Sequence, residues 1–493
     1  MLTISKKNES YIKVDSEDKG ILAELSEFFT FKVPGYKFMP SYRNKLWDGN
    51  IRLYNARTKE IYAGLYYHVL KFAEAEGRNY KIVTDFVQEK NQIDIDKFIN
   101  SISYSSKGKP ITPYKEQKEA IEHSINNKKA IILSPTASGK SLIIYSIVRW
   151  LLENEEGKIL IIVPTTSLVE QMYTDFADYS EFDENFDHEQ TVHRIYSGKD
   201  KDSDKRVFCS TWQSIHRLGP EYFEKFTGII GDEAHQYKAK SLISIMTNLS
   251  NASYRIGTTG TLDQTQTHEL VLQGLFGPIK RIVSTKQLIE DGKLAKLNIQ
   301  GIVLKHPDEE KKIISKLKYQ DEIDYIVTNE KRNKFIRNLA LDLQGNTLVL
   351  FQFVEKHGKP LYNQIRKKAS NDRSIYYVSG ETDTAIREEI RHKIEKQTNS
   401  IIVASFGSYS TGINITNINN IIFASPSKSQ IRILQSIGRG LRKSSDGRDT
   451  VLYDLIDDFS WKKKENYALL HGKERIKIYS KEQFPFKLHE VPI

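Results

Sequence analysis

The chain has 493 residues, of which 39% are hydrophobic and 28% are charged. At about 150 residues per domain, this length suggests roughly three domains, and the apolar fraction is sufficient for packed cores. No apolar run approaches the ~18 residues of a bilayer span, and the polar start MLTISKKNES lacks a signal-peptide core, so we expect no membrane-spanning or secreted protein. A single cysteine, Cys209, can form no intramolecular disulfide, which is typical of a reducing, cytoplasmic compartment.

The net charge of +10 favours a polyanionic partner, with nucleic acid first. Between Phe31 and Lys59 there are seven basic residues, one acid and six interleaved aromatic residues, which suits phosphate attraction combined with stacking. We expect most of these aromatic side chains to form the core of a small domain while the basic side chains face DNA. The predicted phosphate contacts are Lys37, Arg43, Lys45 and Arg52.

The predicted elements divide the chain into five segments. Residues 1–105 are expected to form a compact α+β module with helices over 21–29 and 66–76, and the polar stretch SSKGKPITP marks its end. Strands then alternate with helices, which predicts an α/β fold with two tandem parallel-sheet lobes, at 106–285 and 331–460. Residues 286–330 are read as a linking segment, and residues 461–493 as a basic C-terminal extension.

The strongest local signal is SPTASGKS, which lies between an apolar strand and an apolar helix. A triphosphate-binding loop needs inward-pointing backbone amides and therefore small residues, and the following helix adds its dipole. Lys140 is predicted to reach the β and γ phosphates, and the Ser141 hydroxyl to ligate magnesium. The residues predicted to bind ATP here are Ser134, Pro135, Thr136, Ala137, Ser138, Gly139, Lys140 and Ser141. The usual pattern begins with glycine, where this chain has serine.

An acidic pair follows the apolar strand GIIGD. Asp232 is predicted to hold magnesium through its water shell, and Glu233 to orient and deprotonate the attacking water. His235 is expected to couple this pair to the segment around Thr259. A carboxylate pair at a strand end is common surface chemistry, but its occurrence together with the loop above favours catalysis.

The stretch QSIGRGLR carries two arginines, Arg439 and Arg442, on one side of a predicted helix. Phosphoryl transfer develops negative charge on the γ phosphate, and a positive side chain from a second lobe can stabilise it. We therefore predict that both arginines, with Lys140 and Glu233, are catalytic. Two such arginines alone more often form a solvated or phosphate-binding face.

Together these motifs resemble those of the superfamily-two helicases over about residues 114–457. The resemblance implies that both parallel-sheet lobes are RecA-like. It implies that Gln117 reads adenine and that GTTGT, residues 257–261, links hydrolysis to DNA contact. It also implies sequence-independent contacts with the nucleic-acid backbone. The residues that it places at nucleic acid are Pro164, Thr165, Thr211, Trp212 and Gln213 in the first lobe and Phe351, Ser405, Thr411 and Gly412 in the second.

Over nearly its whole length the chain also resembles recombination and branch-migration helicases of large tailed phages, in stretches such as YRNKLWDGNIRLYN and KSQIRILQSIGRGLRK. This resemblance implies ATP- and magnesium-driven 3′ to 5′ movement on forks, Holliday junctions and R-loops, and hence contact with RNA in RNA–DNA hybrids. It implies a phage-encoded protein in the cytoplasm of a bacterial host. Since two lobes in one chain suffice for one ATP site, a monomer is expected.

Two alternatives remain open from the sequence. An RNA helicase shares the DEAH letters, and a DNA-binding scaffold could carry an inactive ATPase. The complete set Lys140, Asp232, Glu233, Arg439 and Arg442 argues against the scaffold.

Overall fold

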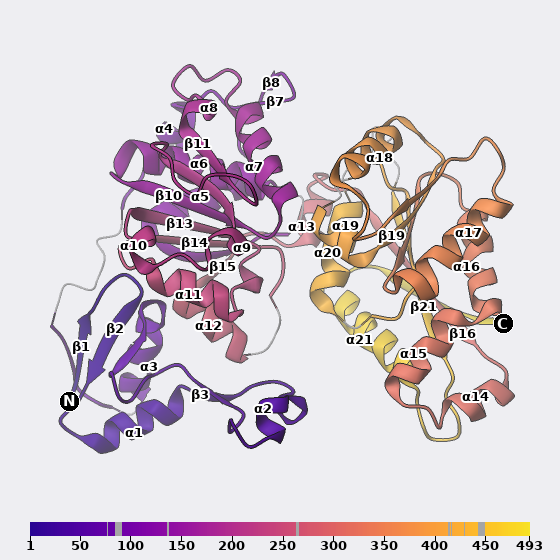
Figure 1. Cartoon of the computed structure of the whole chain (residues 1–493), viewed down its shortest axis with the longest axis horizontal. Helices are drawn as coiled ribbons and strands as arrows, with labels where there is room; N and C mark the ends of the chain where they lie inside the picture. Colours follow the sequence, from indigo (N-terminus) through magenta and orange to yellow (C-terminus); the bar gives the residue numbers. More distant parts are fainter. Residues whose placement is uncertain are drawn as a thin grey trace. The chain divides into compact units, whose positions relative to one another are not determined.

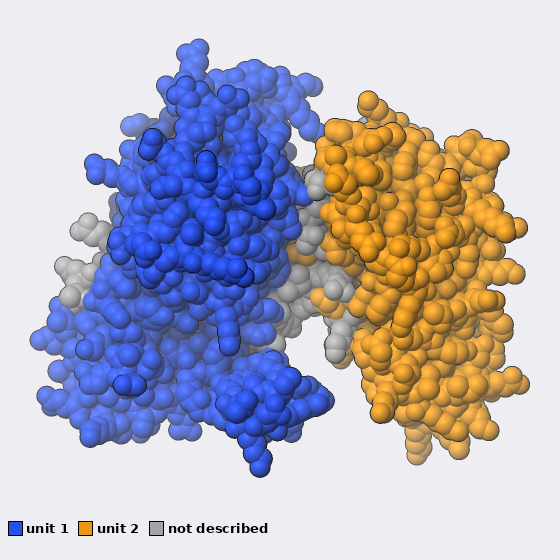
Figure 2. Space-filling view, viewed as in Figure 1, with its two compact units in different colours: residues 1–134, 138–282 blue, residues 135–137, 283–493 orange. Residues whose placement is uncertain are grey.

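The chain folds into two compact units in a computed structural model, residues 1–134 with 138–282 and residues 135–137 with 283–493 (Figure 2). The structure describes residues 1–75, 77–83, 91–135, 138–262, 266–412, 415, 417–427, 429–441 and 449–493, without the side chains of 266, 384, 410–412, 430–432 and 439. Each unit contains a seven-stranded parallel sheet, which confirms the predicted pair of RecA-like lobes.

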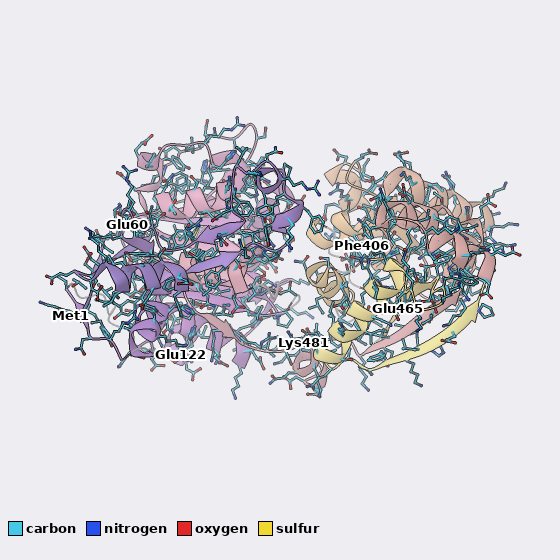
Figure 3. The ribbon with its side chains drawn as sticks, turned by 90° about the horizontal axis from the view of Figure 1, so that it is seen from below. Met1, Glu60, Glu122, Phe406, Glu465 and Lys481 are labelled. Carbon is cyan, nitrogen blue, oxygen red and sulfur yellow. The ribbon has the colours of Figure 1, made fainter. Side chains whose placement is uncertain are left out.

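The N-terminal module is built on a four-stranded sheet with strand order β5-β2-β1-β6. Glu60, labelled in Figure 3, begins the edge strand β5. The strands of this sheet are β1 (Leu2–Lys6), β2 (Tyr11–Asp15), β5 (Glu60–Tyr62) and β6 (Tyr80–Ile82). Helices α1 (Lys19–Phe28) and α3 (Tyr66–Ala75) confirm the two helices predicted here. A separate ribbon, β3 (Thr30–Lys32) with β4 (Asn50–Arg52), leads to the short helix α2 (Pro40–Arg43), which stands out in Figure 1.

The sheet of the first lobe has the order β11-β12-β10-β13-β14-β9-β15. Its central strands are runs of Ile and Val that are buried on both faces, as parallel strands covered by helices require. The strands are β9 (Lys129–Leu133), β10 (Lys158–Val163), β11 (Val192–Ile195), β12 (Val207–Thr211), β13 (Phe226–Asp232), β14 (Tyr254–Thr259) and β15 (Ile279–Arg281). The helices are α4 (Ile95–Asn100), α5 (Lys115–Asn127), α6 (Lys140–Asn154), α7 (Thr166–Tyr179), α8 (His188–Thr191), α9 (Trp212–Ile215), α10 (Pro220–Phe223), α11 (Lys240–Asn248) and α12 (Gln266–Phe276).

The sheet of the second lobe has the order β18-β19-β17-β20-β21-β16-β22. Its strands are β16 (Leu297–Lys305), β17 (Thr347–Phe351), β18 (Ile375–Val378), β19 (Ile401–Ser405), β20 (Asn420–Phe423), β21 (Thr450–Asp458) and β22 (Phe486–Pro492). The helices of this unit are α13 (Thr285–Glu290), α14 (Asp308–Ile314), α15 (Tyr319–Thr328), α16 (Glu330–Asp342), α17 (Lys359–Lys368), α18 (Thr384–Lys396), α19 (Phe406–Gly412), α20 (Gln430–Gly440) and α21 (Tyr467–Lys481).

Three of the predicted segment limits differ from the structure. Helix α4 precedes residue 105, yet Phe98 and Ile99 pack in the core of the first lobe, so the module ends earlier than predicted. Strand β16 falls in the predicted linking segment but pairs with β21 throughout its length. The predicted C-terminal extension supplies α21 and the edge strand β22, which pairs with β16 from Ile299 to Lys305. Both strands belong to the second sheet through their backbone pairing, and most residues of β22 stay exposed.

Among the described residues, no helix combines the length and the apolar character needed to cross a bilayer.

Candidate ATP site and nucleic-acid interface

The predicted phosphate loop joins β9 to α6 in the first lobe. The Ser134 amide donates to the Thr259 carbonyl (3.0 Å), and the Ser134 hydroxyl donates to Ser138 Oγ (2.7 Å). Gly139 has a φ of 78°, a conformation that favours glycine, and a Cβ there would lie 2.2 Å from Gln117 Nε2 and displace that amide. Thr136 and Ala137 lie outside the described residues.

The two polar side chains that open α6 already have contacts in the protein. Lys140 Nζ lies 3.5 Å from the Ser134 carbonyl oxygen. Ser141 Oγ lies 2.7 Å from the hydroxyl of Tyr179, the last residue of α7. Nothing in the sequence distinguishes Tyr179 from a core aromatic residue, so sequence reasoning missed this contact. A ligand at Ser141 would compete with the tyrosine for the serine hydroxyl.

Asp232 and Glu233 lie at the carboxyl end of β13, two strands from β9 in the same sheet. Asp232 accepts a hydrogen bond from Thr258 Oγ1 (2.7 Å). Burial raises the pKa of Asp232 and repulsion from Glu233 adds to this, whereas the positive charge of Lys140 opposes it. The interaction between Lys140 and Asp232 links the phosphate loop electrostatically to the acidic pair.

Glu233 adopts a left-handed backbone conformation, with φ of 52°. This conformation is uncommon for a residue other than glycine, and such strain clusters at functional sites. It turns the chain from the extended strand β13 directly into the short helix Ala234–Gln236. The side chain of Glu233 is thereby held beside the end of the sheet.

His235 makes the predicted contact with the segment around Thr259. Its Nδ1 lies 3.2 Å from Glu233 Oε2 and 3.0 Å from Thr259 Oγ1. The Thr259 hydroxyl in turn donates to the Thr261 carbonyl (2.9 Å). The acidic pair and the GTTGT segment are therefore joined through one imidazole.

Gln117 is buried against the phosphate loop. Its Oε1 accepts from the Tyr114 amide (2.8 Å), and its Nε2 donates to the Ser138 carbonyl (3.0 Å). The side chain therefore caps α5 and braces the loop in this structure. Recognition of adenine by Gln117 stays a prediction.

The oxygen donors at this site suit magnesium. Ser141 offers a hydroxyl and Asp232 a carboxylate, and hard oxygen ligands are those that Mg²⁺ prefers. Within the described ranges no group of three or more His, Cys, Asp or Glu residues could hold a metal ion. Mg²⁺ usually takes its remaining ligands from water and phosphate oxygens.

The nucleic-acid contacts predicted in the first lobe lie on two neighbouring strand ends. Strands β10 and β12 are paired in parallel up to Val163 and Thr211, so the segments that follow them emerge at the same sheet edge. The Thr165 hydroxyl accepts from the Leu168 amide (3.3 Å) and caps α7, and Thr211 Oγ1 lies 2.9 Å from Ser214 Oγ. The remaining predicted contacts here are the partly buried Pro164 and Trp212 and the exposed Gln213.

In the second lobe the prediction for Phe351 is wrong. Its ring is fully buried and stacks on Tyr377 at 5.7 Å between ring centroids, so the side chain cannot reach nucleic acid. The apolar run that forms β17 simply continues through it. Ser405 is also buried, and its hydroxyl donates to Ser408 Oγ (2.9 Å) at the start of α19.

The remaining predicted contacts of the second lobe are only partly described. Thr411 and Gly412 lie in α19, and Arg439 lies in α20, without described side chains. Arg442 lies outside the described residues.

The basic-aromatic stretch departs from prediction in two ways. Of its six aromatic residues only Tyr54 is buried, and Phe38 is 76% exposed, because residues 33–49 form a projection instead of a core. Arg52 forms an ion pair with Asp48, which raises the pKa of the guanidinium. Lys37, Arg43 and Lys45 are exposed and have no carboxylate partner in the part of the chain that the structure describes.

Two RecA-like lobes, one of them carrying a phosphate loop with a DEAH segment, define a superfamily-two helicase. Residues 2–85 match the family "DNA helicase UvsW, N-terminal", residues 110–264 "Type III restriction enzyme, res subunit" and residues 330–444 "Helicase conserved C-terminal domain". The ATP-dependent DNA helicase uvsW of Enterobacteria phage T4 is 37% identical over 506 residues, which cover 98% of each chain. The chain therefore belongs to the UvsW family of DNA helicases.

Two further similarities extend over most of the chain. The crystal structure of T4 UvsW matches with a TM-score of 0.53 and 34% identity, covering 100% of this chain and 99% of that one. The DNA 3′-5′ translocase XPB2 of Sulfurisphaera tokodaii is 25% identical over 422 residues, 79% of this chain and 90% of the relative.

Proposed function

We propose that this protein is an ATP- and magnesium-driven DNA helicase that moves 3′ to 5′ and remodels branched DNA. One observation carries the proposal. Lys140, Ser141, Asp232 and Glu233 follow the carboxyl ends of β9 and β13 in the first lobe, and His235 joins this group to Thr259. The names of the relatives, a DNA helicase and a DNA 3′-5′ translocase, support DNA as the substrate and the direction of movement.

Each residue of the site has a defined part in this proposal. Lys140 and the loop amides bind the phosphates, while Ser141 and Asp232 hold magnesium, which neutralises developing charge when bound. Glu233 orients the attacking water and accepts its proton. Arg439 and Arg442 supply positive charge to the γ phosphate, and Gln117 reads the adenine.

Nucleic acid is held by backbone contacts in both lobes. Thr165, Thr211 and Gln213 offer polar groups in the first lobe, and Ser405 with the Thr411–Gly412 segment does so in the second. Such contacts position a strand without reading its sequence. We place the activity in the bacterial host cell of a phage, on forks, Holliday junctions and R-loops, with one chain as the working unit.

An ATPase assay on the full chain tests this proposal. Phosphate release is measured with no nucleic acid, with single-stranded DNA, with duplex DNA and with RNA of equal length. We expect stimulation by DNA and its loss in Lys140→Ala, because the phosphates lose their charged partner, with Lys199→Ala on an exposed loop as the control. Stimulation by RNA alone supports the RNA helicase, and no hydrolysis under any condition supports the scaffold.

Grip on branched DNA is tested separately through the projection. Replacing Lys37, Arg43 and Lys45 with alanine should weaken binding to four-way junctions more than binding to single strands. It should also flatten the slope of log affinity against log salt by about 0.9 for each phosphate that the variant no longer neutralises. The control removes three exposed lysines of the first lobe, Lys107, Lys109 and Lys199. An equal effect of both variants would assign the effect to net charge alone.

A further inference from the structure

The projection of residues 33–49 ends in apolar side chains that the protein leaves in solvent. Phe38 is 76% exposed, Leu46 is 81% exposed and Met39 is 37% exposed. All three flank α2, Phe38 and Met39 before it and Leu46 after it, in the segment that stands apart from the rest of the module in Figure 1. We call these three residues the apolar tip. Phe38 and Leu46 have the largest exposed fractions of any large hydrophobic side chain among the described residues.

The apolar tip is mounted on a compact support. The rings of Tyr36 and Tyr42 contact edge to face at 4.7 Å between centroids, and Trp47 Nε1 donates to the Asn50 carbonyl (2.7 Å). A Cβ on Gly49 would lie 2.5 Å from the Tyr36 ring, so the chain passes this ring without spare room. The Leu46 amide donates to the Ser41 carbonyl (2.9 Å), which closes the turn after α2.

Positive charges surround the apolar tip. Lys37 and Lys45 are the sequence neighbours of Phe38 and Leu46, and Arg43 ends α2. The one acid of the stretch, Asp48, is already paired with Arg52. A partner that fits this surface must present negative charge beside a flat apolar face. Nucleic acid presents both where a stack of bases ends, because phosphates flank an exposed base pair.

We propose that the apolar tip packs against the terminal base pair at a DNA branch point, with Lys37, Arg43 and Lys45 on the adjoining phosphates. Inside a continuous duplex each base pair is covered by its neighbours, so no base face is exposed to the apolar tip. A fork or junction exposes the face of a terminal base pair. Apolar side chains are known to enter or cover base steps in this way, and stacking tolerates any sequence. The proposal rests on the proposed function and identifies what makes a branch distinct from a duplex.

The experiment uses the full chain and two DNA probes of equal charge, a replication-fork mimic and a continuous duplex. Hairpin loops close every helix end of both probes except the branch, so that only the branch exposes a base pair. The fork carries 2-aminopurine in the base pair at the branch. Phe38→Ala combined with Leu46→Ala should bind the fork roughly tenfold more weakly, by the loss of stacking, and bind the duplex as the wild type does. Its salt slope should stay unchanged, and the 2-aminopurine signal seen with the wild type should disappear. Phe38→Trp should retain that signal.

Phe182→Ala is the matched control, because Phe182 is a 45% exposed phenylalanine of the first lobe. Wild-type fork affinity and 2-aminopurine signal in the double variant would overturn the proposal. The apolar tip would then bind a partner other than DNA. An equal loss on fork and duplex would also overturn it. A wild-type protein with no preference for the fork overturns the proposed action on branched DNA together with this inference.

Discussion

Glu233 combines a strained backbone with a catalytic assignment. Its left-handed φ of 52° costs free energy of order 1 kcal/mol or more, which the surrounding sheet must offset. The same turn brings its carboxylate to within 3.2 Å of His235. The strain is therefore explained if the side chain must leave the end of β13 in one particular direction.

Glu233→Gln should abolish most turnover while retaining nucleotide binding. The amide has the same shape and can keep the turn, but it cannot accept the proton of the attacking water, so we expect kcat to fall by about 10²–10⁴. Single-turnover phosphate release and nucleotide titration measure the two effects separately. Glu181→Gln, on an exposed turn, is the control, and a loss of nucleotide affinity equal to the loss of turnover would contradict the assignment.

Asp457 illustrates how charge is accommodated in the core of the second lobe. It is fully buried, and its Oδ1 accepts from Arg332 Nε (2.8 Å) and lies 3.1 Å from His306 Nε2. Burial alone would raise the pKa of Asp457, but Arg332 and His306 lower it to about 2, below its ordinary value of 3.8. The ion pair therefore stabilises the folded state above pH ~4 and ceases to do so as the pH falls toward 2.

Asp457→Asn should reduce stability at neutral pH by about 3–5 kcal/mol, because it leaves the Arg332 charge buried without a counter-ion. It should also reduce the loss of stability between about pH 4 and pH 2, to which Asp457 contributes in the wild type. Denaturant unfolding at several pH values measures both changes. Asp372→Asn, at an exposed position, provides the comparison, and a variant with unchanged acid sensitivity would show that other carboxylates dominate.

At the candidate site, the sequence signals some residues more clearly than it signals side-chain contacts. Lys140, Asp232 and Glu233 stand out because phosphate chemistry demands fixed residue types at strand ends, and their roles stay predictions. Tyr179 carries no such signal, since its contact with Ser141 joins the end of one helix to the start of another. Phe351 was mistaken for a contact because a motif at a strand end contains both core and surface positions.

At the scale of elements, strands were predictable where they are uniformly apolar. The central strands β9, β10 and β17 are buried on both faces and read as short runs of Ile, Val and Leu. Strands β16 and β22 were missed because LNIQGIVLK and FKLHEVP interrupt their apolar residues with polar ones. The edge strand β22 is mostly exposed and does not resemble a buried parallel strand, so its place in the sheet depends on tertiary pairing with β16.

Removal of residues 486–493 should destabilise the second lobe and promote self-association. Strand β16 would lose its partner from Ile299 to Lys305 and become an exposed edge with unpaired backbone groups. Thermal unfolding and light scattering measure these effects. Deletion of Ile493 alone keeps the seven paired positions and serves as the control. A monomeric, fully stable truncated chain would show that β22 is dispensable.

At the scale of the molecule, the N-terminal module shares one hydrophobic core with the first lobe. The buried cluster runs without interruption from Leu2 and Phe29 in the module to Phe276 in α12. Arg255 of β14, which is 1% exposed, donates to the Ser10 hydroxyl (3.1 Å) and to the carbonyls of Met246 (2.6 Å) and Leu275 (2.8 Å). The module is therefore an integral part of the first unit.

Arg255→Met should weaken the module and the lobe together. The change leaves several buried carbonyls without hydrogen-bond donors. Each of them that water cannot reach lowers the free energy of unfolding by about 1–3 kcal/mol. Calorimetry should show one lowered transition for the first unit, with no separate transition for residues 1–83. Arg217→Met, at an exposed position, is the control. Two resolved transitions would mean that the module unfolds independently.

Two glycines at the contact between module and lobe limit which segments can be exchanged with those of relatives. A Cβ on Gly64 would lie 2.0 Å from the Gln273 carbonyl oxygen, and a Cβ on Gly274 would lie 2.9 Å from Tyr62 Cβ. Each glycine thus accommodates the backbone or side chain of the other segment. A chimera that exchanges only the first eighty or so residues would set a foreign surface against these glycines. A chimera that exchanges α12 together with the module keeps both contacting segments from the same protein. We therefore expect functional chimeras when α12 and the module are exchanged together.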